Sequence, residues 1–448
     1  MAGIPRTSQR IEGRAVMDYN LSDLQEWDEK ICAIAKKHGL DWFDIEYEFV
    51  DYYSMIGAMA FHGLPSHFNH WSFGKSFERT HHMYNAGQEG LPYELIINSN
   101  PSLAYMMREN ALPLQILIMA HCVGHSDFFK NNRTFKGTRP DTIVGRSRAA
   151  KKRIQGYVED PTIGIDLVEQ VIDSCHAIQF QIQRPGWIRR SRKEIIELHK
   201  EKLKEDPDAD WLDTSHNPLE PDYDILGFIS ENARIPDWKR DVIEVCRDEG
   251  KYFWPQIQTK IMNEGWASYW HYTILHELDL PPELHLAFIK SHNQVIRPHI
   301  GGINPYHLGF HLFQRIKERH GVDEMFIARE VHHDAAFIRQ YLTQADCEEL
   351  NLFSYSRKKN DDVSVDDVSD EDGWEEVKKD LVNQVGGGSI PVLYVLDVRK
   401  DGSMALGHEH DGRDLDMKEL KATLQHVKNL WEFDVNLDTI IDGKYMKF

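Results

Sequence analysis

The stretch Glu264-Gly-Trp-Ala-Ser-Tyr-Trp-His271, taken together with His121-Cys-Val-Gly-His125, decides how this chain is interpreted. Two histidines four residues apart lie on the same face of a helix, because about 3.6 residues complete one turn. A carboxylate from a second helix would complete a set of two histidines and one glutamate. Three protein ligands with one open position are typical of catalytic zinc rather than structural zinc. The sequence therefore predicts a divalent metal, with zinc favoured, at His121, His125 and Glu264.

The histidine pair alone is a weak signal. The chain has 24 histidines and contains a second pair with the same spacing, His307 and His311. The second motif adds weight, because Asn263-Glu-Gly-Trp-Ala-x-Tyr269 resembles the third-ligand helix of gluzincin metallopeptidases, where the glutamate binds zinc. In that group the following Gly and Ala let two helices approach closely. The resemblance implies a gluzincin-like core, although Cys122 stands where a zinc peptidase carries its general-base glutamate.

Composition restricts the class of protein. At 448 residues the chain is long enough for about two or three domains, and its 41% hydrophobic and 28% charged residues are typical of a soluble globular protein. No apolar run approaches the ~18 residues of a membrane span. The net charge of −20 argues against general nucleic-acid binding, because no basic excess exists to neutralise phosphates. Five separated cysteines without a C-x-x-C motif favour a reducing cytoplasm over a disulfide framework.

The pattern along the chain predicts three segments. Residues 1–16 are polar and are expected to form a flexible N-terminus. Residues 17–348 are expected to form a large, mainly helical, metallopeptidase-like domain. Apolar residues at helical spacing predict helices over 21–60 and two helices over 237–278, whereas 61–100 is expected to be rich in loops.

From about residue 349 the apolar period changes from ~3.6 residues to two. Strands are predicted at 350–356, 391–398, 403–410 and 434–441, helices at 373–385 and 417–431, and an acidic loop over 358–372. The order β-α-β-β-α-β is that of a ferredoxin-like domain. The predicted fold class is therefore α+β, with a large helical, gluzincin-like domain followed by a small ferredoxin-like domain over 349–448.

Several longer motifs resemble a single family over nearly the whole chain. They are Tyr84-Asn-Ala-Gly-Gln88, Glu94-Leu-Ile-Ile-Asn98, Ala120-His-Cys-Val-Gly-His-Ser-Asp-Phe-Phe-Lys-Asn-Asn132, Thr259-Lys-Ile-Met-Asn-Glu-Gly-Trp-Ala-Ser-Tyr-Trp-His271 and Asn304-Pro-Tyr-x-Leu-Gly309. On these motifs the chain is identified as a member of the stage V sporulation protein R (SpoVR) family. The resemblance implies a role in spore cortex formation or in stress-linked envelope processes. Relatives are often encoded beside a serine kinase and a von Willebrand-type protein, which the resemblance suggests as partners.

With Cys122 in place of the glutamate, hydrolysis would need another base. The candidate catalytic residues are Glu249, His271 and Tyr306. Glu249 is considered as a base, and His271 as a base, a fourth ligand or an oxyanion donor. Tyr306 is considered as a transition-state donor, by analogy of position. Asp127 is considered as a base or, alternatively, as a carboxylate that holds a ligand imidazole in one tautomer.

Three interpretations stay open on these residues. The first is a pseudoenzyme or regulator built on a metal-binding peptidase scaffold. The second is an active metal-dependent hydrolase on a peptide or cell-envelope precursor, and the third is a metal-free structural or interaction protein. A general base typically contributes about 10²–10⁴ in rate. The sequence therefore predicts no general endopeptidase activity of the gluzincin type, because Cys122 cannot supply that base.

Overall fold

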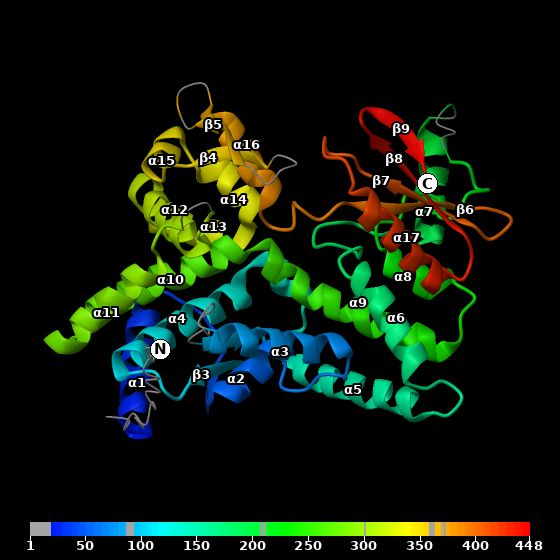
Figure 1. Ribbon diagram of the computed structural model, residues 1–448. Helices are drawn as coiled ribbons and strands as arrows, with labels where there is room; N and C mark the ends of the chain where they lie inside the picture. Colours follow the sequence, from blue (N-terminus) through cyan, green and yellow to red (C-terminus); the bar gives the residue numbers. More distant parts are fainter. Residues whose placement is uncertain are drawn as a thin grey trace, which may run out of the picture.

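The computed structural model describes residues 19–86, 94–206, 208, 212–299, 302–357, 363–368, 370 and 373–448. The segment 1–16, expected to be flexible, lies outside the described residues. The fold is α+β, as predicted, with a large helical region and a small four-stranded sheet near the C-terminus (Figure 1). Among the described helices, none combines the length and apolar character needed to cross a bilayer.

The N-terminal part holds a small sheet among helices. Its elements are α1 (Leu21–Lys37), β1 (Ile45–Val50), α2 (Tyr52–Ala60), α3 (Trp71–Asn85), β2 (Glu94–Ile97), β3 (Ser102–Met107) and α4 (Leu112–Asn131). In the sheet order β1-β3-β2, β1 runs parallel to β3 and β2 antiparallel to it. The prediction of helices alone over 21–60 was wrong, as was that of loops over 61–100. The alternation in Ile45-Glu-Tyr-Glu-Phe49 carries the two-residue period of a half-buried strand.

The middle of the chain is helical. It contains the 3₁₀ helices η1 (Arg133–Gly137) and η2 (Pro140–Thr142), followed by α5 (Ile143–Glu159), α6 (Ile165–Ala177), α7 (Arg192–Glu205), α8 (Ile225–Asn232), α9 (Asp237–Gln258), α10 (Lys260–Glu277), α11 (Pro282–Val295), α12 (Pro305–His320), α13 (Val322–Val331), α14 (Asp334–Tyr341) and α15 (Gln344–Glu349). The two helices predicted over 237–278 are α9 and α10. Helix α10 packs against both α4 and α12. Side chains of α4 are buried from Gln115 through Phe129, so this helix lies inside the core and is not amphipathic.

The C-terminal part follows the predicted strands and helices but divides them differently. Its elements are β4 (Phe353–Arg357), β5 (Val363–Val368), α16 (Trp374–Gln384), β6 (Leu393–Val398), β7 (Met404–His408), α17 (Met417–Trp431), β8 (Val435–Ile441) and β9 (Lys444–Lys447). Strands β4 and β5 form a two-stranded sheet, separate from the sheet β6-β7-β8-β9. The expected single ferredoxin-like sheet over 349–448 is therefore wrong.

The acidic segment 358–372 was expected to be a loop, but β5 occupies 363–368 of it. The rest, apart from residue 370, lies outside the described residues. Pairing β4 with the strand that follows it closes a much shorter loop than pairing it with strands beyond residue 390, and short loops cost less entropy. The β-branched valines of Val363-Ser-Val365 also favour a strand.

The four-stranded sheet shares a core with the middle of the chain. Val395 of β6 and Val427 of α17 belong to the same buried cluster as Ile172 of α6 and Ile229 of α8. The Gln181 side chain extends this contact, because its amide bonds to the backbone at both ends of the segment 391–393. Helix α16, which precedes the four-stranded sheet in the chain, packs instead on α14 and β4.

Candidate metal centre

Small residues set the spacing of the helices around the centre. A Cβ atom added at Gly124 of α4 would lie 2.7 Å from the Cα atom of Ala267 in α10. On the other side of α10, a Cβ at Gly265 would collide with the backbone of Gly309 in α12. The Gly and Ala of the motif therefore both permit close approach, but to two different helices.

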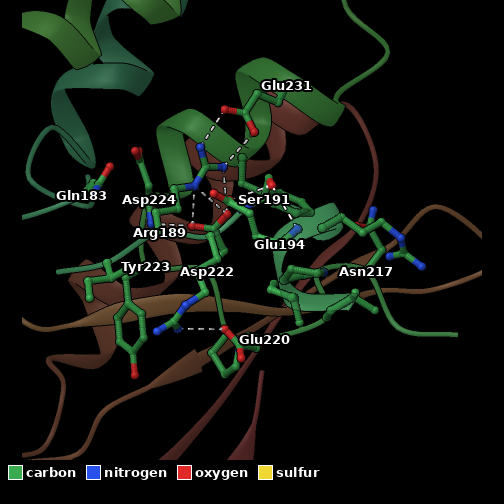
Figure 2. A pocket seen from close by; sticks show the side chains of 18 of the residues that line it. Gln183, Arg189, Ser191, Glu194, Asn217, Glu220, Asp222, Tyr223, Asp224 and Glu231 are labelled. Atoms are coloured by element: carbon green, nitrogen blue, oxygen red, sulfur yellow. Dashed lines mark hydrogen bonds and ion pairs between the residues drawn. The ribbon is translucent and has the colours of Figure 1, made fainter. Parts of the chain in front are cut away.

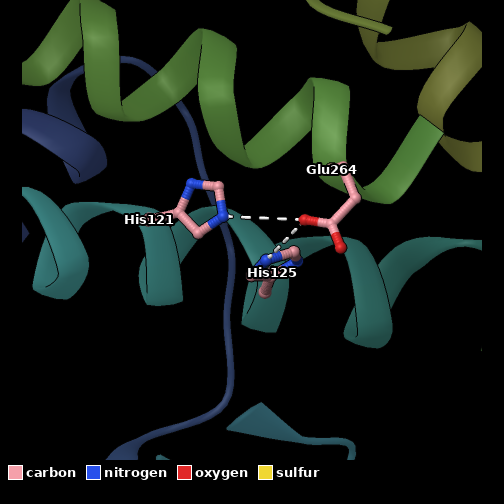
Figure 3. A group of neighbouring side chains, drawn as sticks. All are labelled: His121, His125 and Glu264. Carbon is pink, nitrogen blue, oxygen red and sulfur yellow. Dashed lines mark ion pairs between the residues drawn. The ribbon is translucent and has the colours of Figure 1, made fainter. Parts of the chain in front are cut away.

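Two imidazoles and one carboxylate converge between α4 and α10 (Figure 3). Glu264 Oε2 lies 3.7 Å from His121 Nε2 and 3.4 Å from His125 Nε2. One donor atom of each residue lies within 4.8 Å of the others, and no second group of this kind occurs in the described part of the chain. The three residues expected from the sequence are thus brought together.

The donor set fits a divalent cation such as zinc, which binds imidazole nitrogen and carboxylate oxygen. His121 Nε2 and Glu264 Oε2 are buried and have no hydrogen-bond partner among the described residues. A buried polar atom without a partner typically costs about 1–3 kcal/mol, so such atoms call for an explanation. A cation between them would satisfy both atoms at once.

Neutral groups hold the two imidazoles from behind. His125 Nδ1 donates to Asn263 Oδ1 at 2.9 Å, which leaves Nε2 of His125 directed at Glu264. His121 Nδ1 lies 2.9 Å from His271 Nδ1. His271 therefore touches a candidate ligand, as its position two turns beyond Glu264 suggested. Asn263 was not singled out by the sequence, although it precedes Glu264 directly.

Asp127 does not hold a ligand imidazole, contrary to expectation. Its carboxylate accepts hydrogen bonds from the Asp41 backbone and from Trp266 Nε1, both at 2.8 Å, and pairs with Arg329 at 2.9 Å. Two residues beyond His125, its side chain projects from a different face of α4. Asp127 ties α4 to its neighbouring elements.

Glu94 is a site residue that the sequence analysis missed. From β2, its Oε1 lies 3.9 Å from His121 Nε2. Burial raises the pKa of Glu94, and the nearby imidazoles of His121 and His125 oppose this only in part. Glu94 precedes α4 by many residues and has no diagnostic spacing, so the one signal was its presence in a quoted family motif.

Cys122 is a buried, neutral thiol. It is fully buried, and burial raises its pKa well above the usual value, with the Glu94 charge as the next cause. A carboxylate is present beside the candidate ligand His121, but β2 supplies it and not α4.

Tyr306 lies beside the same centre at the start of α12. The Asn304 side chain caps this helix by accepting from the Tyr306 backbone at 3.0 Å. The Tyr306 ring stacks on His121 with centroids 6.1 Å apart. The Glu264 charge, followed by burial, raises the pKa of Tyr306 well above its usual value. Its hydroxyl therefore remains a proton donor at neutral pH.

The charges within the centre are strongly coupled. Burial lowers the pKa of His125, but the Glu264 carboxylate, 3.4 Å from His125 Nε2, and the Asn263 hydrogen bond outweigh burial and raise that pKa overall. Burial raises the pKa of Glu264, yet its contacts with His121 and His125 hold that pKa far below the usual range. Glu264 is thus an anion facing two imidazoles, as a metal ligand must be.

A cavity of about 650 Å³ opens onto the centre. His125, Glu264 and Tyr306 line it, together with consecutive residues 94–96 of β2. Side chains alternate along a strand, so three consecutive lining residues mean that the cavity meets the strand edge and not one face. That edge of β2 has no partner among the described residues.

Glu249 is not brought to this centre. It accepts a hydrogen bond from His67 Nε2 at 2.7 Å and lines another cavity of about 350 Å³. A third cavity, of about 530 Å³, lies beside α7 and α8. There the Arg189 guanidinium is already paired with Asp222 and Glu231 (Figure 2). Neither cavity contains a convergent set of ligands like that around Glu264.

The family description "SpoVR like protein" matches residues 18–390. The chain belongs to the SpoVR family. A second description, "SpoVR-like C-terminal domain", matches residues 390–442, so the family divides just before β6. Within the family, the chain is similar to "Uncharacterized protein YcgB" of Escherichia coli (strain K12). The two are 32% identical over 478 residues, which cover 94% of this chain and 92% of that protein. No solved structure matches the chain.

Proposed function

We propose that this SpoVR protein is a divalent-metal-dependent hydrolase that cleaves an amide bond in an extended peptide. The observation that carries the proposal is the convergence of His121, His125 and Glu264, with unpartnered atoms on His121 and Glu264, beside a cavity that Glu94 also lines. Zinc is the metal that this donor set favours.

His121, His125 and Glu264 would hold the metal, which when bound polarises a carbonyl and makes water a stronger nucleophile. Glu94 would take the proton from the attacking water, because its Oε1 lies 3.9 Å from His121 Nε2, the nitrogen that would bind the metal. Tyr306 would donate its hydroxyl proton in a hydrogen bond to the developing oxyanion. Glu94 thereby replaces the base that Cys122 cannot supply.

The edge of β2 supports a peptide as the substrate. An extended chain can pair with a free strand edge through backbone hydrogen bonds, while its alternate side chains enter the cavity. Residues 94–96 present such an edge directly beside Glu264. The cell-envelope role suggested by family resemblance fits this chemistry, because envelope precursors contain peptides. All five cysteines are free thiols, which supports our placement of the protein in a reducing cytoplasm.

A pseudoenzyme or regulator on the same scaffold is the second candidate. The observation in its favour is Cys122, a neutral thiol at the position of the peptidase base. In that case the cavity would bind a peptide without cleaving it. The serine kinase and von Willebrand-type proteins encoded near relatives would then be the first partners to test.

Elemental analysis and peptide cleavage together test the proposal. The protein, purified without chelator or histidine tag, is expected to hold about one zinc per chain and to cleave a restricted set of peptides. Glu94→Gln should retain the zinc and lose about 10²–10⁴ in rate, the usual contribution of a general base. Glu46→Gln, on the opposite edge strand β1, is the matched control and should retain full activity. Zinc without cleavage would favour the pseudoenzyme, and absence of metal would contradict both candidates.

A further inference from the structure

Three histidines stand in line behind the metal centre. His121 Nδ1 lies 2.9 Å from His271 Nδ1, and His271 Nε2 lies 2.7 Å from His292 Nδ1. Each of the three comes from a different helix: α4, α10 and α11. Both distances are those of ordinary hydrogen bonds. The line joins a candidate ligand to a residue with no place in the chemistry described above.

The direction of the hydrogen bonds follows from the ligand at one end. A metal takes the lone pair of His121 Nε2, so the proton of that neutral imidazole must be on Nδ1. His271 Nδ1 must then accept, which puts the proton of His271 on Nε2. His292 Nδ1 accepts in turn. One choice at His121 thus fixes the tautomer of all three rings.

The surroundings favour neutral rings at His271 and His292. His271 is fully buried and His292 is 2% exposed, with the rings of Tyr272, Phe288 and Phe310 around His292. Burial lowers the pKa of His271 well below its usual value and lowers that of His292 to about 4. The next titratable group, His276, also acts to lower the pKa of His292. A neutral ring can pass on the hydrogen-bond direction without adding charge.

We propose that His271 and His292 are positioning residues that hold His121 in the tautomer with a proton on Nδ1, so that Nε2 faces the metal. This inference rests on the proposed function, because it needs a metal at His121. It also answers the role left open for His271, which is neither a fourth ligand nor a base. Ligating histidines usually donate to a carboxylate, a carbonyl or water. Behind His121 the acceptor is another imidazole, that of His271. Behind His125 the acceptor is the side-chain carbonyl of Asn263.

The neutral support has a chemical consequence. A carboxylate behind a ligating histidine increases the electron density that the ring gives to the metal. Behind His121 and His125 stand neutral acceptors, so Glu264 is the one anionic ligand in the set. With neutral support behind both imidazoles, these residues would leave a bound cation more of its positive charge, which would favour polarisation of a carbonyl.

Nitrogen NMR on the full-length, zinc-loaded protein with ¹⁵N-labelled histidine tests the tautomers directly. The expected pattern is a protonated Nδ1 on His121, and an unprotonated Nδ1 with a protonated Nε2 on His271. Signals are assigned by their loss in His121→Gln and His271→Asn. Zinc coordination by His271, or a proton on its Nδ1, would overturn the positioning role while leaving the metal site intact. A protein that binds no zinc overturns the proposed function, and the positioning role with it.

Matched variants test the energetic contribution. His271→Asn keeps an acceptor near the position of Nδ1, whereas His271→Leu removes it. Loss of an outer partner typically weakens metal binding about 10–100-fold. We therefore expect such a loss of zinc affinity in His271→Leu, and a change of no more than about threefold in His271→Asn. Equal affinities in two folded variants would overturn the proposal. If His271→Leu fails to fold, His292→Leu and His292→Asn repeat the comparison one ring further out, with a smaller difference of the same sign.

Discussion

In the described part of the chain, two buried groupings of histidine with glutamate invite comparison, because they are built from the same residue types at similar depth. In the first, His67 Nε2 donates to Glu249 at 2.7 Å, and His67 Nδ1 lies 3.1 Å from the Phe68 carbonyl. In the second, Glu264 lies 3.4 Å and 3.7 Å from the two imidazoles that face it. The first is a closed pair in which every ring nitrogen has a partner. The second is an open centre, in which His121 Nε2 and Glu264 Oε2 face one another at 3.7 Å without a hydrogen bond.

The open centre is held open by its surroundings. The imidazoles of His121 and His125 are fixed from behind by His271 and Asn263. The contact between α4 and α10 sets how far Glu264 can advance. In the closed pair the Phe68 carbonyl also holds His67 from behind, but His67 Nε2 bonds directly to Glu249. Residue types therefore do not distinguish the two groupings, whereas the unpartnered atoms of His121 and Glu264 do.

The largest expected effect comes from removing the anion of each grouping in turn. Glu264→Gln should weaken zinc binding by more than about 100-fold, beyond the loss typical of an outer partner. Glu249→Gln should leave zinc binding unchanged and lower the free energy of unfolding by about 1 kcal/mol, through a weakened hydrogen bond. Zinc titration and chemical denaturation of both variants measure these effects. Loss of zinc binding in Glu249→Gln would contradict the distinction drawn between the two groupings.

The spacing of the helices gives the next effect. Gly309→Ala would place a methyl group against the backbone of α10 at Ile261 and Gly265. Such overpacking typically costs about 1–3 kcal/mol. Gly145→Ala in α5 meets nothing within 4 Å, so a small stabilisation is expected there from helix propensity. Thermal unfolding of the two variants should therefore shift in opposite directions, and equal shifts would mean that the contact between α10 and α12 is not tight.

The smallest expected effect is the change of zinc affinity with each pH unit. Glu264 raises the pKa of His125 above 6.5, so in the metal-free protein the ring keeps a proton up to that higher pKa. Zinc must displace this proton, and affinity should rise by up to about tenfold per pH unit through this range and then level off. His125 stabilises the metal-free fold fully below pH 6.5 and loses this effect as pH rises through its folded pKa. Calorimetry at pH 6, 7 and 8 measures the slope, which Glu264→Gln should flatten and Glu249→Gln should preserve.

Local periodicity was enough to predict that His121, His125 and Glu264 lie together, but not what surrounds them. His121 and His125 share a helix face because of their spacing, and the motif around Glu264 indicated the second helix. Glu94 and His292 carry no such signal, because each reaches the centre only through tertiary packing. The role considered for Glu249 depended on nearness in sequence to the α10 helix, and the structure pairs it with His67 instead.

The C-terminal strands show a similar division. The two-residue period predicted most strand positions, because apolar residues alternate with polar ones in a strand that is buried on one face. It could not predict which strands pair. Strand β4 pairs with β5, and β9 completes the four-stranded sheet as an exposed edge. Strand pairing depends on loop lengths and on competing partners, which no single segment contains.

The shared core of the middle and C-terminal regions has a consequence for synthesis on the ribosome. Chains emerge from the N-terminus, and regions generally fold as units once complete. Ile172 and Ile229 are made more than 160 residues before Val395 and Val427, against which they finally pack. The nascent chain must therefore carry an uncovered apolar surface until the last strands are translated. A premature stop near residue 390 would leave that surface permanently exposed, and such a fragment becomes a substrate for chaperones and proteases.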